Sequence, residues 1–305
     1  MATQNPIVST ITGYVEQHSD ELLVASVLGA RSAKMFDLMT GLKGKAKLNY
    51  METDPILQDA SACGWSESGT TEFTQREIDP KYLKINMAFC DKNLLKTVHQ
   101  HAVKVAAGMK NLPFEQEWTK NISDKVAAAI ERMIYFGDGS NSNEFDGLIP
   151  ILEAASAVTT NVSATSGTSA YAFIKEVAIK IPAQVKNPVI LVSTSLYREF
   201  MQDLVSANLF HYDPANGEDG YKLPGTNIQV LGVEGLIPGV NDGFDYALAG
   251  AIENFVYGVD LEGDSDTWDL WYSKDNKEFR LDCEFIAGTQ VKFPAEVTVG
   301  KRARS

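Results

Sequence analysis

A long, uninterrupted helical pattern near the middle of the chain constrains the fold most strongly. Pro113 suits the first turn of a helix, and Glu115 and Glu117 suit the positive end of the helix dipole. At ~1.5 Å per residue, a helix over residues 113–136 is about 36 Å long, which exceeds the usual helix of a compact domain. The helix carries one apolar stripe, formed by Ile122, Val126, Ala129, Ile130, Met133 and Ile134.

The segment Gly137-Asp138-Gly139 directly follows this pattern and predicts the end of the helix. Glycine enters the left-handed conformation after a last helical turn more readily than other residues, and Gly139 is the candidate for that position. Two acidic runs, residues 138–146 and 260–266, imitate calcium loops. Each lacks glycine at the sixth loop position and glutamate at the twelfth, so we interpret both as solvated acidic turns.

A polar segment in the first third of the chain separates two strand-like patterns. Residues 61–71 are rich in Ser, Gly and Thr, and residues 82–89 then carry apolar side chains largely on alternate positions. We predict a long β-hairpin from about residue 43 to residue 84, too exposed to form a core. Because such a hairpin cannot be held by its own chain, we expect Trp65 and Phe73 to contact a neighbouring subunit.

The remaining sequence predicts a helical arm, an α/β lobe and long returning strands. An apolar helical stripe over residues 7–28 is interrupted at Gly13, and a polar linker is expected over residues 159–169. Alternating apolar residues over 268–299 indicate antiparallel strands, and the basic end, residues 301–304, is expected to be a mobile tail. The α/β lobe is predicted from helices over 170–181 and 195–207 and strands over 188–192, 227–231 and 245–249.

Length and charge limit the classes of function. A chain of 305 residues exceeds the usual size of one hydrophobic core, so two lobes or one core with long extensions are expected. The net charge of −13 argues against a protein that grips nucleic acid, because phosphate neutralisation needs clustered Lys and Arg. Residues 137–275 hold 20 acidic and 6 basic side chains. Such an acidic segment suits surfaces that face solvent or repel DNA. The segments in which acidic and basic residues balance are then expected to form the contacts between copies.

The N-terminus has neither a basic region followed by an apolar one nor a stretch long enough to cross a bilayer. We therefore expect the protein to be made and kept in the cytosol, with no membrane partner. Cys63, Cys90 and Cys283 are widely separated and odd in number, which neither a disulfide scaffold nor a zinc site would show. We interpret all three as small buried or half-buried apolar residues.

Motifs for phosphate binding, serine hydrolysis and zinc proteolysis are absent from the sequence, so we predict no catalytic residues, no cofactor and no metal site. His99 and His101 have no cysteine or acidic partner nearby and are interpreted as polar surface. The alternative of a soluble α/β enzyme would place its site near Asp213 or Asp242. It is disfavoured because no nucleophile and base stand together there.

Three segments, taken in order, resemble one family. IERMIYFGDGS at residues 130–140, with FDGLI at residues 145–149, resembles a long helix that runs into a Gly-Asp-Gly turn and then a Gly-Leu pair. PVILVSTSLYREF and GYKLPGTNIQV, at residues 188–200 and 220–230, are similar to the strand, helix and strand of an axial domain. FRLDCEFIAGTQVKFPA, at residues 279–295, is similar to a long terminal strand with a Pro-Ala ending. The chain thus resembles the Hong Kong 97-type major capsid proteins of tailed bacteriophages over nearly its whole length.

The resemblance implies an α+β fold of this type. It implies an N-terminal arm over residues 1–34, an extended β-hairpin loop over 35–95, and a peripheral domain over 96–150 with a long spine helix. An axial α/β domain over 151–262 would follow, and residues 263–305 would return to the peripheral domain.

The resemblance also implies a non-enzymatic shell subunit of the virion, assembled in the host cytoplasm through hexamers and pentamers around double-stranded DNA that it does not bind specifically. Portal, a separate scaffolding protein and a decoration protein are implied partners. Many relatives begin with a long scaffolding segment, whereas this arm starts close to Met1, so scaffolding is separate, unneeded or already removed. The alternative is an encapsulin-like nanocompartment that stores a cargo enzyme, which shares the fold. Terminase and portal genes beside this one would favour the phage.

Overall fold

A computed structural model describes residues 6–54, 70–90, 114–156, 159–210, 220–237, 243–260 and 267–304 of the chain. Its helices are α1 (Pro6–Val27), α2 (Arg31–Met35), α4 (Phe114–Phe136), α5 (Leu148–Ala154), α6 (Ala170–Ile179) and α7 (Thr194–Ser206). Its strands are β1 (Asp37–Met39), β2 (Ala46–Asp54), β3 (Thr70–Ile78), β4 (Lys81–Cys90), β5 (Thr160–Ala164), β6 (Val189–Ser193), β7 (Tyr221–Lys222), β8 (Gln229–Val233), β9 (Phe244–Gly250), β10 (Phe255–Asp260), β11 (Thr267–Ser273), β12 (Glu278–Val291) and β13 (Thr298–Ala303).

The longest strand, β12, is the centre of a five-stranded sheet. It pairs antiparallel with β4, β11 and β10, and β1 adds to β10 in parallel. Side chains alternate across a strand, so from Phe279 to Phe285 one face of β12 is apolar and buried while the other is polar. The buried set is Phe279, Leu281, Cys283 and Phe285. From Phe285 to Val291 every residue of the strand is buried.

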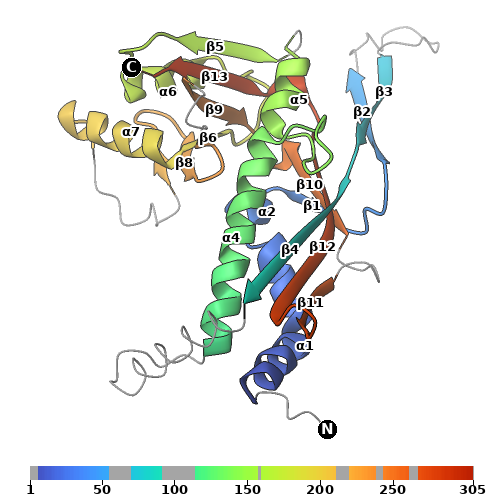
Figure 1. Ribbon diagram of the computed structural model, residues 1–305. Coiled ribbons are helices and arrows are strands. Elements are labelled where there is room, and N and C mark those ends of the chain that lie inside the picture. The colour runs from blue at the N-terminus through green and yellow to red at the C-terminus, as the bar shows by residue number, and fades with distance from the viewer. Residues whose placement is uncertain are drawn as a thin grey trace, which may run out of the picture.

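Helices α1 and α4 cover the apolar side of this sheet, and α4 runs the length of the subunit (Figure 1). The predicted helix over residues 113–136 is therefore present as α4. The two helices are joined deep in the interface, where Ser26 Oγ donates to Ser123 Oγ at 3.1 Å. The break in α1 lies at His18, where the backbone leaves the helical conformation, and not at Gly13 as expected.

A six-stranded sheet forms the second lobe, in the order β5, β13, β9, β6, β8, β7. Helices α6 and α7 pack on one face through a compact apolar cluster that includes Phe173, Val177 and Phe200. Both helices begin at a serine cap, with Ser169 Oγ accepting from the Ala172 N–H and Ser193 Oγ accepting from the Leu196 N–H. This lobe contains the helices and strands predicted over residues 170–249.

The two lobes share one apolar core. Leu191, Leu248 and Val299 of the six-stranded sheet belong to the same buried cluster as α4 and β12. The chain crosses between the sheets twice in close proximity, before β10 and after β12. Asn254 ties these crossings together, because its Nδ2 donates to the Phe293 carbonyl at 2.8 Å and its Oδ1 accepts from the Phe293 N–H at 2.7 Å.

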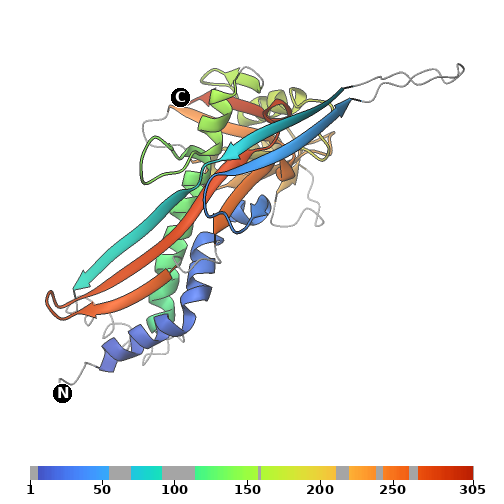
Figure 2. The same ribbon diagram turned by 90° about the vertical axis from the view of Figure 1, so that its right-hand side faces the viewer.

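Strands β2 and β3 form a separate two-stranded ribbon that leaves the body of the subunit (Figure 2). The expected hairpin is thus present in part, but its second boundary differs. Residues 82–89 form β4, which pairs with β12 in the five-stranded sheet instead of with β2. The reason is apolar burial: Leu83 lies on the inward face of β4, opposite the buried Phe285, and belongs to the same core cluster.

Three other expected boundaries also differ from the structure. Residues 159–169, expected to be a linker, contain β5, which pairs in parallel with β13. The basic C-terminus, expected to be a mobile tail, forms the second half of β13 inside the six-stranded sheet, so residues 263–305 divide between both sheets. Residues 255–260, expected in the axial lobe, form β10 of the five-stranded sheet. In each case the partner strand lies far away in the sequence.

Candidate assembly site

The base of the β2–β3 hairpin is fixed firmly to the five-stranded sheet. Ile78, at the end of β3, is fully buried and packs with Leu42 against the Gly258 position of β10. Gln290 Nε2 of β12 donates to the Glu77 carbonyl at 2.6 Å, which joins the hairpin to the central strand. The ribbon therefore leaves the body in a defined direction.

Charged contacts at the surface support the same base. Lys45 Nζ lies 3.2 Å from both Glu77 Oε1 and Asp79 Oδ2. Hydrogen bonds with Asp79 first and with Glu77 second raise the pKa of Lys45. All three side chains are substantially exposed, so these pairs orient the base more than they stabilise it.

One of the two aromatic residues predicted to contact a neighbour lies in this hairpin. The Phe73 backbone lies in β3 opposite Met51 of β2, well beyond the fixed base. Trp65 lies outside the described residues. Their contact with a neighbouring subunit stays a prediction.

The turn after α4 is closed by hydrogen bonds to acidic side chains. The helix ends at Phe136. The Asp138 N–H donates to Glu144 Oε2 at 2.9 Å, and the Gly139 N–H donates to Asp146 Oδ1 at 3.1 Å. Hydrogen bonds from Ser140 lower the pKa of Asp138. Acidic side chains of residues 138–146 thus accept hydrogen bonds from the backbone N–H groups of their own loop.

Glycine is required in this turn by close packing and not by a left-handed backbone, which corrects the expectation for Gly139. Neither Gly137 nor Gly139 has a positive φ. A Cβ atom added to Gly139 would lie 2.3 Å from Asp146 Oδ1, and one added to Gly137 would lie 2.3 Å from the Phe145 carbonyl oxygen. A side chain at Gly137 would displace the backbone of the loop that returns to α5, whereas one at Gly139 would displace the Asp146 carboxylate.

A buried polar cluster joins the N-terminal helices to α4 and the second lobe. Glu131 of α4 is 3% exposed and accepts hydrogen bonds from the Ser32 N–H at 2.9 Å and from Ser32 Oγ at 2.5 Å. The fully buried Tyr135 hydroxyl lies 2.6 Å from the same Ser32 oxygen. Burial raises the pKa of Glu131, while the hydrogen bonds from Ser32 and Gly235 partly oppose that shift. Beside this cluster lies a cleft of about 460 Å³.

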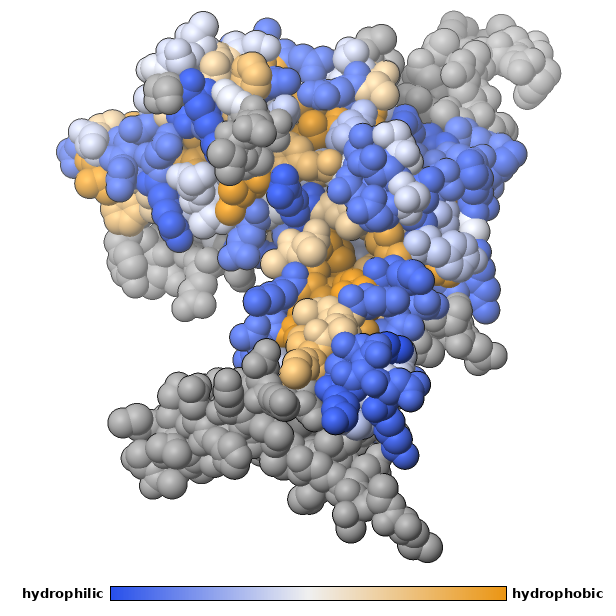
Figure 3. Space-filling model, viewed as in Figure 1, coloured by the Kyte–Doolittle hydropathy of each residue, from blue (hydrophilic) through white to orange (hydrophobic). Residues whose placement is uncertain are grey.

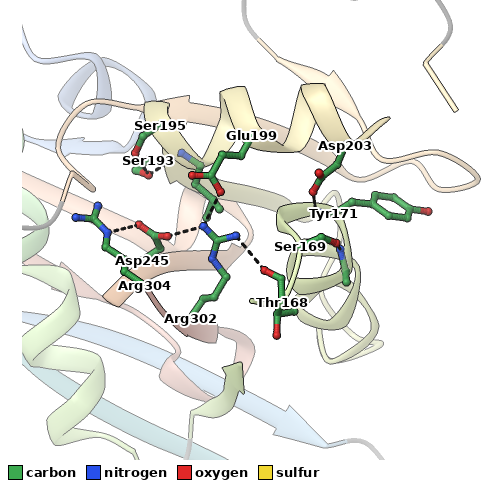
Figure 4. A network of polar contacts seen from close by, with 12 residues as sticks. Thr168, Ser169, Tyr171, Ser193, Ser195, Glu199, Asp203, Asp245, Arg302 and Arg304 are labelled. Carbon is green, nitrogen blue, oxygen red and sulfur yellow. Dashed lines mark hydrogen bonds and ion pairs between the residues drawn. The ribbon is translucent and has the colours of Figure 1, made fainter. Parts of the chain in front are cut away.

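The C-terminal strand carries a buried ionic network in the six-stranded sheet (Figure 4). Arg302 lies 2.6 Å from Asp245 Oδ2 and 2.7 Å from Glu199 Oε2, and it donates to the Thr168 carbonyl at 3.2 Å. Arg304 Nε lies 2.8 Å from the other Asp245 oxygen. Asp245 is 4% exposed and Arg302 is 8% exposed, so the network holds β13 against β9 and α7.

The cysteines and the candidate metal ligands were also predicted from the sequence. Cys283 is buried as predicted, whereas Cys90 is exposed, which corrects that expectation. Among the described residues, no group of three or more His, Cys, Asp or Glu side chains could hold a metal ion. Within the same residues, no helix is both long and apolar enough to span a membrane. Cys63, His99, His101, Asp213 and Asp242 lie outside the described residues.

Comparisons with known proteins give matches among solved structures. No protein-family model and no curated protein matches the sequence. A chain of the satellite phage P4 procapsid, from a structure that includes the size determination (Sid) protein, matches with a TM-score of 0.62 and 10% identity, covering 100% of this chain and 94% of that one. The chain has the fold of phage capsid proteins.

Two further structures show how widely this phage capsid fold is shared at low identity. A chain of Mycobacterium phage Ogopogo has a TM-score of 0.60 at 12% identity, with 90% of this chain and 92% of that one covered. A chain from the capsid of the native GTA particle has a TM-score of 0.55 at 13% identity, with 92% and 97% covered. The matches include both lobes, so the phage capsid fold accounts for the chain as a whole.

Sequence reasoning found the turn residues of the phage capsid fold but missed the residues that tie its parts together. Ser32, Glu131 and Tyr135 fall into helices that read as ordinary amphipathic segments. Asp245 and Arg302 are 57 residues apart, and neither has a local motif. No local signal marks Arg302, which stands between Lys301 and Ala303.

Proposed function

We propose that this chain is the major capsid protein of a tailed phage, assembling through hexamers and pentamers into an icosahedral head that encloses double-stranded DNA. The observation that carries this proposal is the fold similarity to a phage procapsid chain over 100% of this chain, arm and projecting ribbon included. A fold shared at 10% identity does not fix a function. The case for the function rests also on charge and shape.

The shape of the subunit suits assembly with copies of itself. Rings made head to tail need two different complementary patches on each chain. The β2–β3 ribbon leaves the body at one end of the subunit, and the N-terminal end of α1 lies at the other (Figure 2). A net charge of −13 suits a container whose wall does not bind concentrated DNA tightly.

The domain roles follow from the observed sheets. We assign α1 to the N-terminal arm, β2 and β3 to the extended loop, and the five-stranded sheet with α4 to the peripheral domain and its spine helix. The six-stranded sheet is then the axial domain. This assignment includes a structural, non-catalytic role in the virion, assembly in the host cytoplasm, and portal, a separate scaffolding protein and a decoration protein as partners.

Assembly of the purified chain tests the function directly. The chain is expressed alone and with candidate scaffolding genes from the same genome, and the products are examined by light scattering and electron microscopy. We expect closed shells or ring-shaped capsomers. A strictly monomeric species at high concentration, across salt conditions and with scaffolding present, would contradict the proposal.

The role of the hairpin is tested separately from that of the body. We expect Trp65→Ala, or replacement of residues 61–71 by a short Gly-Ser turn, to leave a folded and soluble subunit that does not close shells. The physical reason is that the ribbon adds little to the core of its own chain, whose buried clusters lie in the two lobes. Loss of the circular dichroism spectrum, or normal shells, would refute the assignment.

A further inference from the structure

Two glycines lie directly opposite each other on β10 and β12, on the face of the five-stranded sheet opposite to the one that α1 and α4 cover. A Cβ atom added to Gly258 would lie 2.6 Å from Leu42 Cδ2, and one added to Gly288 would lie 3.1 Å from Pro80 Cα. Leu42 precedes β2 and Pro80 follows β3, so both ends of the ribbon rest on this glycine pair. We call Gly258 and Gly288 the hairpin seat.

Gln290 is the polar side chain that joins the ribbon to the sheet beside the hairpin seat. It lies two residues beyond Gly288, on the same face of β12, and is 9% exposed. Its Nε2 donates to the Glu77 carbonyl of β3 at 2.6 Å, and its Oε1 accepts from the Val291 N–H at 3.0 Å. Because both ends of the amide are bonded, the side chain is held in one orientation.

The ribbon beyond its base has a polar surface. Lys47, Asn49 and Gln75 are exposed, and Figure 3 shows hydrophilic surface on the side where the ribbon leaves, whereas the apolar surface lies in the body. Strands of nine residues are about 30 Å long, so a tilt of about 10° at the base moves the far end by about 5 Å. The contacts at the base therefore determine where the far end of the ribbon lies.

We propose that Gln290 is a positioning residue for assembly, which sets the angle at which the β2–β3 ribbon leaves the sheet and, through that angle, the curvature of the shell. This inference rests on the proposed function. Subunits joined head to tail form a closed ring only when the rotation from one copy to the next closes. A displaced ribbon changes that rotation, so copies join at a different angle. Gln290 acts here through the ribbon and not by touching the neighbouring copy.

Thr289 provides a matched control on the opposite face of the same strand. Its hydroxyl donates to the Asp146 carbonyl in the loop after α4, away from the ribbon. Gln290→Met keeps the length of the side chain and removes its hydrogen bonds, and Thr289→Val keeps the shape and removes one. Both variants should lower the urea midpoint of the unassembled subunit, because each loses hydrogen bonding inside the fold. Only Gln290→Met should change the direction of the ribbon.

The direction of the ribbon can be measured in the unassembled subunit by the distance between two spin labels. The labels are attached after Asn49→Cys in β2 and Lys84→Cys in β4, because both positions are exposed. Cys63 and Cys90 are replaced by serine, and the buried Cys283 is out of reach of the label. Electron microscopy of the same chains without labels then measures the diameter of the particles.

We expect Gln290→Met to shift or broaden the distance distribution, whereas Thr289→Val keeps the wild-type distribution. The fraction of closed shells with the wild-type diameter should fall about fivefold or more in Gln290→Met, the ratio that corresponds to the net loss of one hydrogen bond. Open sheets or particles of other diameters should replace them. Gly288→Ala, whose Cβ would press on Pro80, should give the same result and carries the test if Gln290→Met does not fold.

Two results overturn the role of Gln290 while the proposed function stands: unchanged distances in Gln290→Met and Gly288→Ala, or shells of the wild-type diameter from both. The same malformed particles from Thr289→Val would show that stability, and not direction, governs the shape of the shell, and would also overturn that role. A wild-type chain that forms neither shells nor capsomers overturns the proposed function, and the link between ribbon and curvature falls with it.

Discussion

The buried ionic network of the C-terminal strand offers the sharpest test of the fold. Asp245 accepts from Arg302 and Arg304 through its two oxygens, at 2.6 and 2.8 Å. We consider the substitution Asp245→Asn, which keeps the size of the side chain and removes its charge. Arg302 would then keep Glu199 as an ion-pair partner, but the Glu199 side chain is 54% exposed and offers a weaker, more screened contact.

The magnitude follows from burial. Removing one partner of a buried ion pair costs about 3–5 kcal/mol, because the other charge remains in a medium of low polarity. The Arg302 side chain is 9% exposed and the Asp245 side chain 6%, so this range applies to their contact. Retention of Glu199 moves the expected loss to the lower end, about 3 kcal/mol of the free energy of unfolding. Arg304, whose side chain is 36% exposed, adds little.

Urea denaturation of the unassembled subunit, followed by circular dichroism, measures this loss. Glu199→Gln serves as the matched control, because it removes the exposed partner of the same arginine and should cost less than about 1 kcal/mol. Arg302→Met in the Asp245→Asn background should recover part of the stability, because it removes the charge left unpaired. A loss below about 1 kcal/mol for Asp245→Asn would show that β13 is not held by this network.

Three further predictions concern the turn after α4 and the buried cluster. Gly139→Ala should lower the free energy of unfolding by about 1–3 kcal/mol, since its Cβ would meet the Asp146 carboxylate, whereas Gly44→Ala, with nothing within 4 Å, should leave it unchanged in urea denaturation. Ser32→Ala should cost about 1–3 kcal/mol in the same measurement, because Glu131 loses a buried donor; a neutral result would contradict the cluster. Burial raises the pKa of Glu131 above 4.5, so the folded state binds its proton more tightly and stability should fall as the pH rises above about 4.5; Glu131→Gln should flatten that part of the profile, and identical profiles would refute it.

Local elements could be predicted from the sequence because their signals are local. Helix α4, helices α6 and α7 and strands β6, β8 and β9 of the second lobe each depend on periodicity or on turn residues within a short window. The Gly137-Asp138-Gly139 segment was placed at the helix end for a partly wrong reason. Glycine ends helices in more than one way, and the close approach of Asp146 becomes visible only when the loop is folded.

Strand pairing between distant segments could not be predicted in the same way. The sequence of β4 is typical of the second strand of a hairpin, because it follows a polar segment and its apolar residues alternate. Nothing in that segment distinguishes pairing with β2 from pairing with β12. The same holds for β10, which follows β9 after a short 3-10 turn and yet belongs to the other sheet. Each of these strands pairs at the position where the complete fold has an apolar face for it to cover.

Asn254 shows why these pairings belong together. In the sequence it is an ordinary polar residue between two apolar strands. In the fold it is 3% exposed, and both side-chain polar atoms and its carbonyl bond the chain at residues 292–293. These hydrogen bonds hold the start of β10 beside the end of β12. β10 therefore lies in the five-stranded sheet, and the chain after β12 continues into β13 of the six-stranded sheet.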